Sequence, residues 1–192
     1  IDRIDPSVEL ISNMEDADDF IPDLLISLGG GLVSKKLKFL LRKHRPPNHW
    51  HITDSNQHWD TFQSLTKVLN CAPDWFLSAL NENIEHSKIG YHLQWQDLHL
   101  KTSEWTKDYL SGKPITDFKL FERLIPKIPK GTCLHLGNST PVRYANLFSM
   151  PKGIQVYSNR GISGIDGVVS TAAGASFNHD GLTLCITGDL GF

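Results

Sequence analysis

The chain has 192 residues and carries 19 Lys and Arg against 21 Asp and Glu, which gives a net charge of −2 at pH 7. Because a nucleic-acid surface needs a clustered excess of positive charge, this balance argues against a nucleic-acid partner. No apolar run approaches the roughly 20 residues of a membrane span, and residues 1–6 lack the regions of a signal peptide. We therefore expect a cytoplasmic protein without a membrane span.

The cysteines favour the same compartment. Cys71, Cys133 and Cys185 are odd in number and widely spaced, and the last two lie in apolar, strand-like runs. This pattern is typical of buried thiols in a reducing environment rather than of a disulfide framework. Because the chain begins without Met and stops sharply at Phe192, we also expect it to be a piece of a longer polypeptide.

The first part of the chain alternates strand-like and helical patterns. Ser34 is the expected N-cap of a helix that follows the tight turn Gly29-Gly30-Gly31, and a long helix ends just before Gly112. The expected strands and helices are 23–28, 34–42, 49–53, 73–80 and 89–110. We place a domain boundary at the end of the last helix, so that residues 1–114 form a Rossmann-like α/β domain.

The second part repeats strand, loop and helix. An amphipathic helix is predicted over 117–128, and Pro129-Lys130-Gly131 separates it from the next strand. The three expected strands are 132–136, 154–158 and 182–187. Such alternation favours right-handed connections and a parallel sheet with flanking helices. The fold class is therefore α/β throughout, with residues 115–192 as a second domain.

A loop rich in small and polar residues follows each strand of the second part. These loops are Gly137-Asn138-Ser139, the stretch 158–167, and Gly188-Asp189-Leu190. Because the carboxyl ends of parallel strands share one edge of a sheet, the three loops are expected to converge on one ligand site. Asp189 stands at a strand tip, where its carboxylate would suit a hard cation such as Mg²⁺, which takes one or two carboxylates together with ligand oxygens.

Two arginines suit the binding of anions in these loops. Arg160 stands at the mouth of a glycine-rich loop and presents a planar fork to a carboxylate. Ser139 heads a helix that carries Arg143 one turn later, so its hydroxyl, the helix N-terminus and the guanidinium could share one anion. Ser139 as a simple N-cap beside a surface arginine is the alternative.

Together these motifs resemble the diphosphate-binding domain of thiamine diphosphate enzymes. The run 159–167, with Gly137-Asn138-Ser139 upstream, resembles one branch, the 2-succinyl-5-enolpyruvyl-6-hydroxy-3-cyclohexene-1-carboxylate synthases of the menaquinone pathway. The resemblance implies a transferase that uses thiamine diphosphate and Mg²⁺. Such an enzyme decarboxylates 2-oxoglutarate and adds the succinyl-semialdehyde unit to isochorismate. It also implies a homo-oligomer for the full-length enzyme and a chain that covers the central domain and the start of the diphosphate-binding domain.

The resemblance also implies roles for individual residues. Ile165 would shape the cofactor and Asp189 would bind Mg²⁺, while three residues from the loops and a basic pair in the first part would bind the anionic substrates. The substrate-binding residues would be Ser139, Arg143, Arg160, Lys35 and Lys36. The cofactor-binding residues would be Ser163, Ile165, Gly188 and Asp189. No catalytic residue is assigned, because the activating Glu of such enzymes lies on a separate domain that nothing here resembles. We therefore expect the isolated chain to be inactive.

Other interpretations remain open. His49, His51 and His58 suggest a zinc site, although without a further ligand such residues are more often packing or surface residues. The enzyme alternative is another thiamine-dependent 2-oxoacid decarboxylase or an acetolactate-synthase-like protein. The non-enzyme alternative is a binding module that kept the fold and lost the site.

Overall fold

The computed structural model describes residues 4–11, 17–55, 57–84 and 90–192. The chain divides into two compact units, built mainly from Ser7–Thr102 and Ser103–Phe192. The division falls within a single helix, α4, upstream of position 114, where the sequence suggests a domain boundary. The boundary at 114 stays a prediction.

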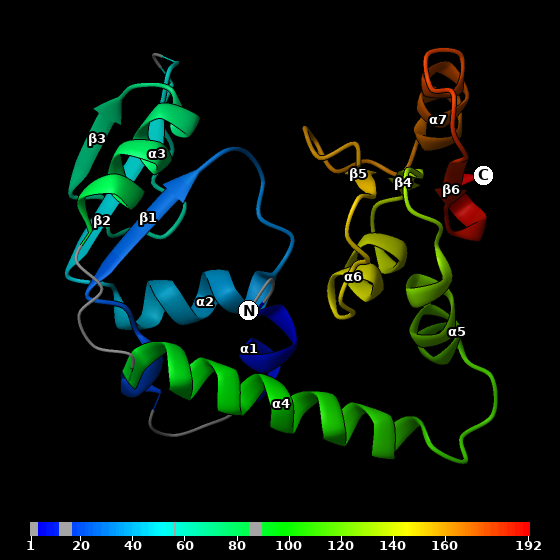
Figure 1. Cartoon of the computed structure of the whole chain (residues 1–192), viewed down its shortest axis with the longest axis horizontal. Coiled ribbons are helices and arrows are strands. Elements are labelled where there is room, and N and C mark those ends of the chain that lie inside the picture. Colours follow the sequence, from blue (N-terminus) through cyan, green and yellow to red (C-terminus); the bar gives the residue numbers. More distant parts are fainter. Residues whose placement is uncertain (1–3, 12–16, 56, 85–89) are drawn as a thin grey trace. The chain divides into compact units, whose positions relative to one another are not determined.

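Both units combine strands with helices, as the sequence pattern predicts (Figure 1). The elements of the first part are α1 (Asp5–Ile11), η1 (Asp18–Phe20), β1 (Leu24–Leu28), α2 (Lys35–His44), β2 (Asn48–Thr53), β3 (Lys67–Asn70), α3 (Pro73–Asn83) and α4 (Gly90–Leu110). Those of the second part are α5 (Asp117–Leu124), η2 (Ile125–Lys127), β4 (Cys133–Leu136), α6 (Thr140–Asn146), β5 (Gln155–Tyr157), α7 (Val168–Ser176), β6 (Thr183–Ile186) and η3 (Asp189–Gly191).

The sheet of the first unit is parallel, with the order β1-β2-β3. Its central strand β2 carries Ile52, which is fully buried, and a side chain of this kind contributes about 1.5–3 kcal/mol when it leaves water. Helix α2 begins as expected, because the Ser34 hydroxyl accepts a hydrogen bond from Leu37 N at 3.1 Å. Strand β3 was not expected; three of its four residues are exposed, although Val68 and Leu69 are apolar.

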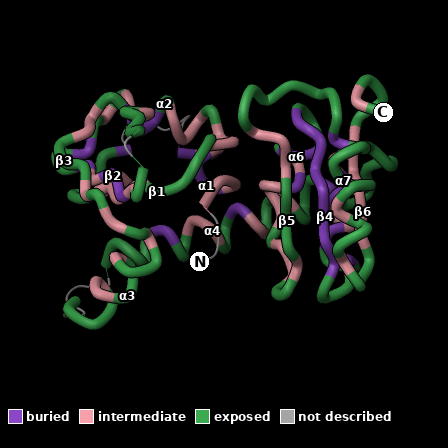
Figure 2. Tube along the Cα trace, turned by 90° about the horizontal axis from the view of Figure 1, so that it is seen from above, coloured by how far each residue is buried: buried purple, intermediate pink, exposed green. Residues whose placement is uncertain are grey.

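The sheet of the second unit is also parallel, with the order β5-β4-β6. All four residues of β4 are buried, and the strand is purple along its length in Figure 2. Leu134 pairs with Val156 on one side and with Leu184 on the other, which places it at the centre of the sheet. The three strands that the sequence predicts in this part are confirmed, to within one residue at each end.

The first helix of the second unit is shorter than predicted. It begins at the predicted Asp117, where the Thr116 hydroxyl caps it by accepting a hydrogen bond from Lys119 N at 3.3 Å. It ends at Leu124 and continues as the 3-10 turn η2, whose second residue is Pro126. Proline has no N–H to donate and its ring clashes with the preceding turn, so α-helical geometry does not extend to residue 128 as the periodicity suggests.

The cysteines behave as expected. All three are free, with Cys133 buried and Cys71 and Cys185 partly buried. Burial raises the pKa of the Cys185 thiol, because a low-dielectric surrounding disfavours the thiolate. Among the described helices, none is both long and apolar enough to cross a membrane.

Candidate functional site

The strand order of the second sheet marks where a ligand can bind. From β4 the chain passes through α6 to β5 on one side, and from β5 it passes through α7 to β6 on the other side of β4. Right-handed crossovers in these opposite directions carry α6 and α7 to opposite faces of the sheet. The strand order thus reverses between β4 and β6, and in open α/β sheets ligands bind beyond the carboxyl ends of the strands at such a point.

A cleft of about 140 Å³ lies at this edge of the sheet. All three of the loops that follow β4, β5 and β6 contribute to its lining, as the sequence predicts. The lining residues are Asn138, Ser139, Thr140, Pro141, Ile165, Thr187, Gly188, Asp189, Leu190 and Gly191. Of the expected site residues, the cleft therefore brings together Ser139, Ile165, Gly188 and Asp189. Arg143, Arg160 and Ser163 belong to the same loops or to α6 but are not among its lining residues.

Close packing of backbone holds the floor of the cleft together. Gly137 N donates a hydrogen bond to Ile186 O at 2.8 Å, which extends the pairing of β4 with β6 beyond the strands. A Cβ on Gly137 would lie 3.2 Å from the Cα of Thr187, so only glycine fits here without a shift. At Gly188, in contrast, a Cβ would meet no atom within 4 Å, so the backbone at this position is open to approach.

Among the described residues that line the cleft, only Asp189 carries a carboxylate. Its Oδ1 accepts a hydrogen bond from Leu190 N at 2.9 Å, and the side chain is otherwise exposed. Among the described residues, no group of three His, Cys, Asp or Glu side chains is arranged to hold a metal ion. A single carboxylate still suits Mg²⁺, because this ion keeps several waters and is commonly bound by one or two carboxylates plus phosphate oxygens. The residues present therefore fit a magnesium ion that arrives with an anionic ligand.

Asn138 links the loops at the cleft, a role that the sequence analysis did not assign to it. Its side chain is buried at 6% exposure, and its Nδ2 donates to Asn159 O at 2.7 Å and to Gly164 O at 2.6 Å. Its Oδ1 accepts a hydrogen bond from Arg160 Nη1 at 2.7 Å. The only signal in the sequence was its place directly after a strand and a glycine.

Arg160 is only partly exposed, and part of its guanidinium lacks a partner. While Nη1 binds Asn138, the Nε atom is buried and has no hydrogen-bond partner among the described residues. A buried donor without a partner is costly, so a site where one occurs calls for an explanation such as a ligand. The arrangement fits the expectation that Arg160 binds a carboxylate, which stays a prediction.

Ser139 departs from the simple interpretation as a helix cap. It occupies the N-cap position of α6, but its side chain makes no capping hydrogen bond. Its φ of 69° with ψ of −126° is a conformation that side chains rarely adopt, and such backbone strain clusters at functional sites. The exposed hydroxyl at the cleft is thus available to a ligand. Arg143, on α6, is exposed as expected.

The structure also places the three remaining residues of the predicted site, Ser163, Lys35 and Lys36. Ser163 also has a positive φ, 58°, and its exposed hydroxyl donates to Arg160 O at 3.4 Å. Lys35 and Lys36 lie at the start of α2 in the first unit, where Lys36 forms an ion pair with Glu9. Neither lysine is among the residues that line the cleft, and their role stays a prediction.

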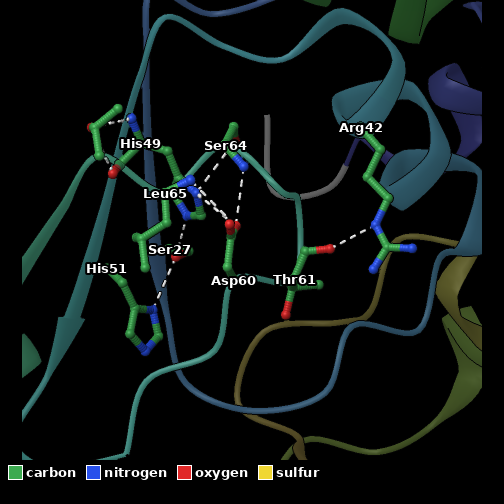
Figure 3. Close-up of polar contacts among 9 residues, drawn as sticks. Ser27, Arg42, His49, His51, Asp60, Thr61, Ser64 and Leu65 are labelled. Atoms are coloured by element: carbon green, nitrogen blue, oxygen red, sulfur yellow. Dashed lines mark hydrogen bonds and ion pairs between the residues drawn. The ribbon is translucent and has the colours of Figure 1, made fainter.

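The histidines that suggested zinc form a hydrogen-bond network inside the first unit (Figure 3). Ser27 Oγ lies 2.8 Å from His49 Nε2 and 3.0 Å from His51 Nδ1. His49 is fully buried, with Ser64 Oγ at 3.4 Å and Asp60 Oδ1 at 3.9 Å from Nδ1. Burial lowers the pKa of His49, and the opposing effect of Asp60 is smaller. These two histidines are packing residues, whereas His58 is exposed.

The fold and the cleft define a class of protein: an α/β protein with a parallel sheet, whose strand-end loops line one cleft. Three curated proteins, all named 2-succinyl-5-enolpyruvyl-6-hydroxy-3-cyclohexene-1-carboxylate synthase, are similar to the chain. That of Flavobacterium psychrophilum is 41% identical, over 93% of this chain and 32% of its own length. The Christiangramia forsetii protein is 39% identical, over 99% and 33%, and that of Phocaeicola vulgatus 35% identical, over 93% and 31%.

The chain is therefore homologous to these synthases over nearly its whole length. It spans about a third of the length of the relatives that it matches. A scan against models of protein families finds no match. The resemblance that the loops 137–139 and 159–167 suggest is thus confirmed by identity that extends well beyond those loops.

Proposed function

We propose that the chain forms part of a thiamine-diphosphate-dependent transferase. This enzyme decarboxylates 2-oxoglutarate and adds the succinyl-semialdehyde unit to isochorismate in menaquinone biosynthesis. One observation carries the proposal: the loops after β4, β5 and β6 enclose a single cleft with one carboxylate, in a chain homologous to synthases with that name. The full-length protein is proposed to be a cytoplasmic homo-oligomer.

The cleft suits the diphosphate end of the cofactor. Asp189 supplies a carboxylate for the Mg²⁺ that accompanies a diphosphate, and the backbone at Gly188 is open to close approach. Ile165, 37% exposed, presents an aliphatic side chain in the same lining, against which the cofactor can be shaped. When bound, thiamine diphosphate supplies the electron sink that decarboxylation of a 2-oxoacid requires.

The proposed substrates are anions, and their carboxylates need polar or basic partners. Arg160 has a buried Nε without a partner among the described residues, and Ser139 presents an uncommitted hydroxyl. A charge-assisted hydrogen bond of this kind contributes about 1.5–3 kcal/mol. Arg143 and the basic pair Lys35-Lys36 are proposed to bind further carboxylate groups of the substrates.

Turnover is proposed to need more than this chain. The relatives are about three times as long, and we assign no residue of this chain to the activation of the cofactor. In enzymes of this kind a Glu from another domain serves that purpose. We therefore expect no sustained turnover from the 192 residues alone.

The test uses the full-length natural protein. Consumption of 2-oxoglutarate is followed with Mg²⁺ and thiamine diphosphate, with and without isochorismate, for the parent, for Arg160→Ala and for the control Arg123→Ala, an exposed arginine on α5. The proposal expects consumption that depends on isochorismate, falls at least about tenfold without Arg160, and is unchanged without Arg123.

The other outcomes point to the alternatives. Consumption that ignores isochorismate, or a preference for pyruvate, would indicate a different 2-oxoacid decarboxylase or an acetolactate-synthase-like enzyme. No consumption by a folded protein would indicate a binding module without catalysis.

A further inference from the structure

Asn138 makes more polar contacts than any other side chain that lines the cleft among the described residues. Nδ2 donates both of its hydrogens to main-chain carbonyls, those of Asn159 and Gly164, at 2.7 and 2.6 Å. Oδ1 accepts from Arg160 Nη1 at 2.7 Å and from Ser158 Oγ at 3.5 Å. One buried amide thus holds both ends of the segment 158–164.

The backbone places this amide rigidly. The preceding residue, Gly137, is bonded to Ile186 O at 2.8 Å and packs directly against Thr187. Asn138 therefore extends from the paired end of β4, the most buried strand of the sheet, toward the loop after β5. A loop anchored in this way takes its position from the sheet rather than from its own exposed residues.

The chemistry of the anchor is specific to an amide. The site requires two donors for the carbonyls and one acceptor for the guanidinium, and a primary amide supplies both. An ionised Asp would supply the acceptor but no donor, and a Ser has a single hydrogen to donate. The three short bonds, 2.6 to 2.7 Å, use both donors of the Asn138 amide and one lone pair of its oxygen.

The contact also engages one end of the Arg160 guanidinium. Guanidinium can bind a carboxylate side-on through Nε and Nη2, or end-on through Nη1 and Nη2. Asn138 occupies Nη1, and the buried Nε has no partner among the described residues. Asn138 therefore holds the guanidinium at Nη1 and leaves the Nε hydrogen unused among the described residues.

We propose that Asn138 is a positioning residue: it fixes the segment 158–164 and holds the guanidinium of Arg160 in place for a carboxylate of the substrate. This inference rests on the proposed function, in which Arg160 binds an anionic substrate. Asn138 acts through Arg160 and takes no part in the chemistry itself. Its loss should weaken substrate binding more than it slows the chemical step.

The test is a double-mutant cycle in the full-length protein. Asn138→Ala, Arg160→Ala and the double variant are compared for the KM for 2-oxoglutarate and for kcat. Asn138→Ala is expected to raise KM about 10- to 100-fold and to change kcat less than about threefold. In the Arg160→Ala background the same change should alter KM less than about twofold. Asn83→Ala is the control, since Asn83 is exposed at the end of α3 and donates to Ala79 O at 2.7 Å.

A second readout does not depend on activity. Amide hydrogen exchange of the segment 158–164, followed by mass spectrometry, should become at least about tenfold faster in Asn138→Ala and stay unchanged in Asn83→Ala. If Asn138→Ala fails to fold, Asn138→Asp keeps the side-chain volume and the acceptor but removes both donors. It is expected to show the same faster exchange.

The outcomes separate this inference from the proposed function. An equal rise of KM in both backgrounds, or no rise, would overturn the positioning role even if the parent is an active synthase. If the parent consumes no 2-oxoglutarate, the proposed function fails. Hydrogen exchange then decides: faster exchange supports the anchor, and unchanged exchange overturns it.

Discussion

Two glycines beside the cleft give a matched pair of substitutions, Gly137→Ala and Gly188→Ala. A Cβ on Gly137 would lie 3.1 Å from Thr187 Oγ1, 3.2 Å from Thr187 Cα and 3.4 Å from Ile186 O. Two of these atoms belong to the backbone that leaves β6, so they cannot rotate away as a side chain can. A Cβ on Gly188 would meet nothing within 4 Å, and the φ of −82° there suits any residue.

The magnitudes follow from these contacts. An extra methyl group in a packed site costs about 1–3 kcal/mol. Replacing glycine by alanine also restricts the unfolded chain, which contributes about 0.4–1 kcal/mol in the opposite direction. We therefore expect Gly137→Ala to lower the free energy of unfolding by about 1–2 kcal/mol. For Gly188→Ala we expect no loss and a gain of up to about 1 kcal/mol.

For ligand binding we expect the opposite order, with Gly188→Ala impaired more than Gly137→Ala. Gly188 lines the cleft, so its new methyl group is expected to hinder the approach of a diphosphate to the backbone. Unfolding in urea measures stability, and the rise in Tm with Mg²⁺ and thiamine diphosphate measures binding. The reasoning is refuted if Gly137→Ala is as stable as Gly188→Ala, or if Gly188→Ala gains as much Tm from the ligands as the parent.

Three further predictions concern the cation, the core and pH. Asp189→Asn should raise the Mg²⁺ concentration for half-maximal activity at least about tenfold, measured by titrating the ion, because the cleft keeps no carboxylate in its lining. Leu134→Ala, at a fully buried position in β4, should lower the free energy of unfolding by about 2–5 kcal/mol in urea. Burial lowers the pKa of both His49 and His135, so the unfolded chain binds more protons than the folded one. The free energy of unfolding should therefore be highest above pH about 6.5 and should decline as the pH falls toward the lowered pKa values of these histidines. Unfolding curves that do not change below pH about 6.5 would contradict this.

The local elements of the fold were largely predictable because each has a local cause. Ser34 caps α2 through its own hydroxyl, and β4 and β6 are short apolar runs between turn residues. Two elements were predicted wrongly, one because of a single proline and one because of a strand distant in the sequence. Pro126 ends the α-helical geometry of α5, and β3 pairs along its length with the distant strand β2.

The convergence of the three loops also followed from sequence, since parallel strands direct their carboxyl ends to one edge. The sequence by itself thus determined the α/β pattern, the glycines and the chemical groups available at that edge. Only the tertiary structure decided how those groups are used. Asn138 meets carbonyls 21 and 26 positions away, and Ser139 adopts a positive φ because the chain must turn sharply after β4. Contacts at such separations depend on how the sheet assembles, and no local pattern of residue types records them.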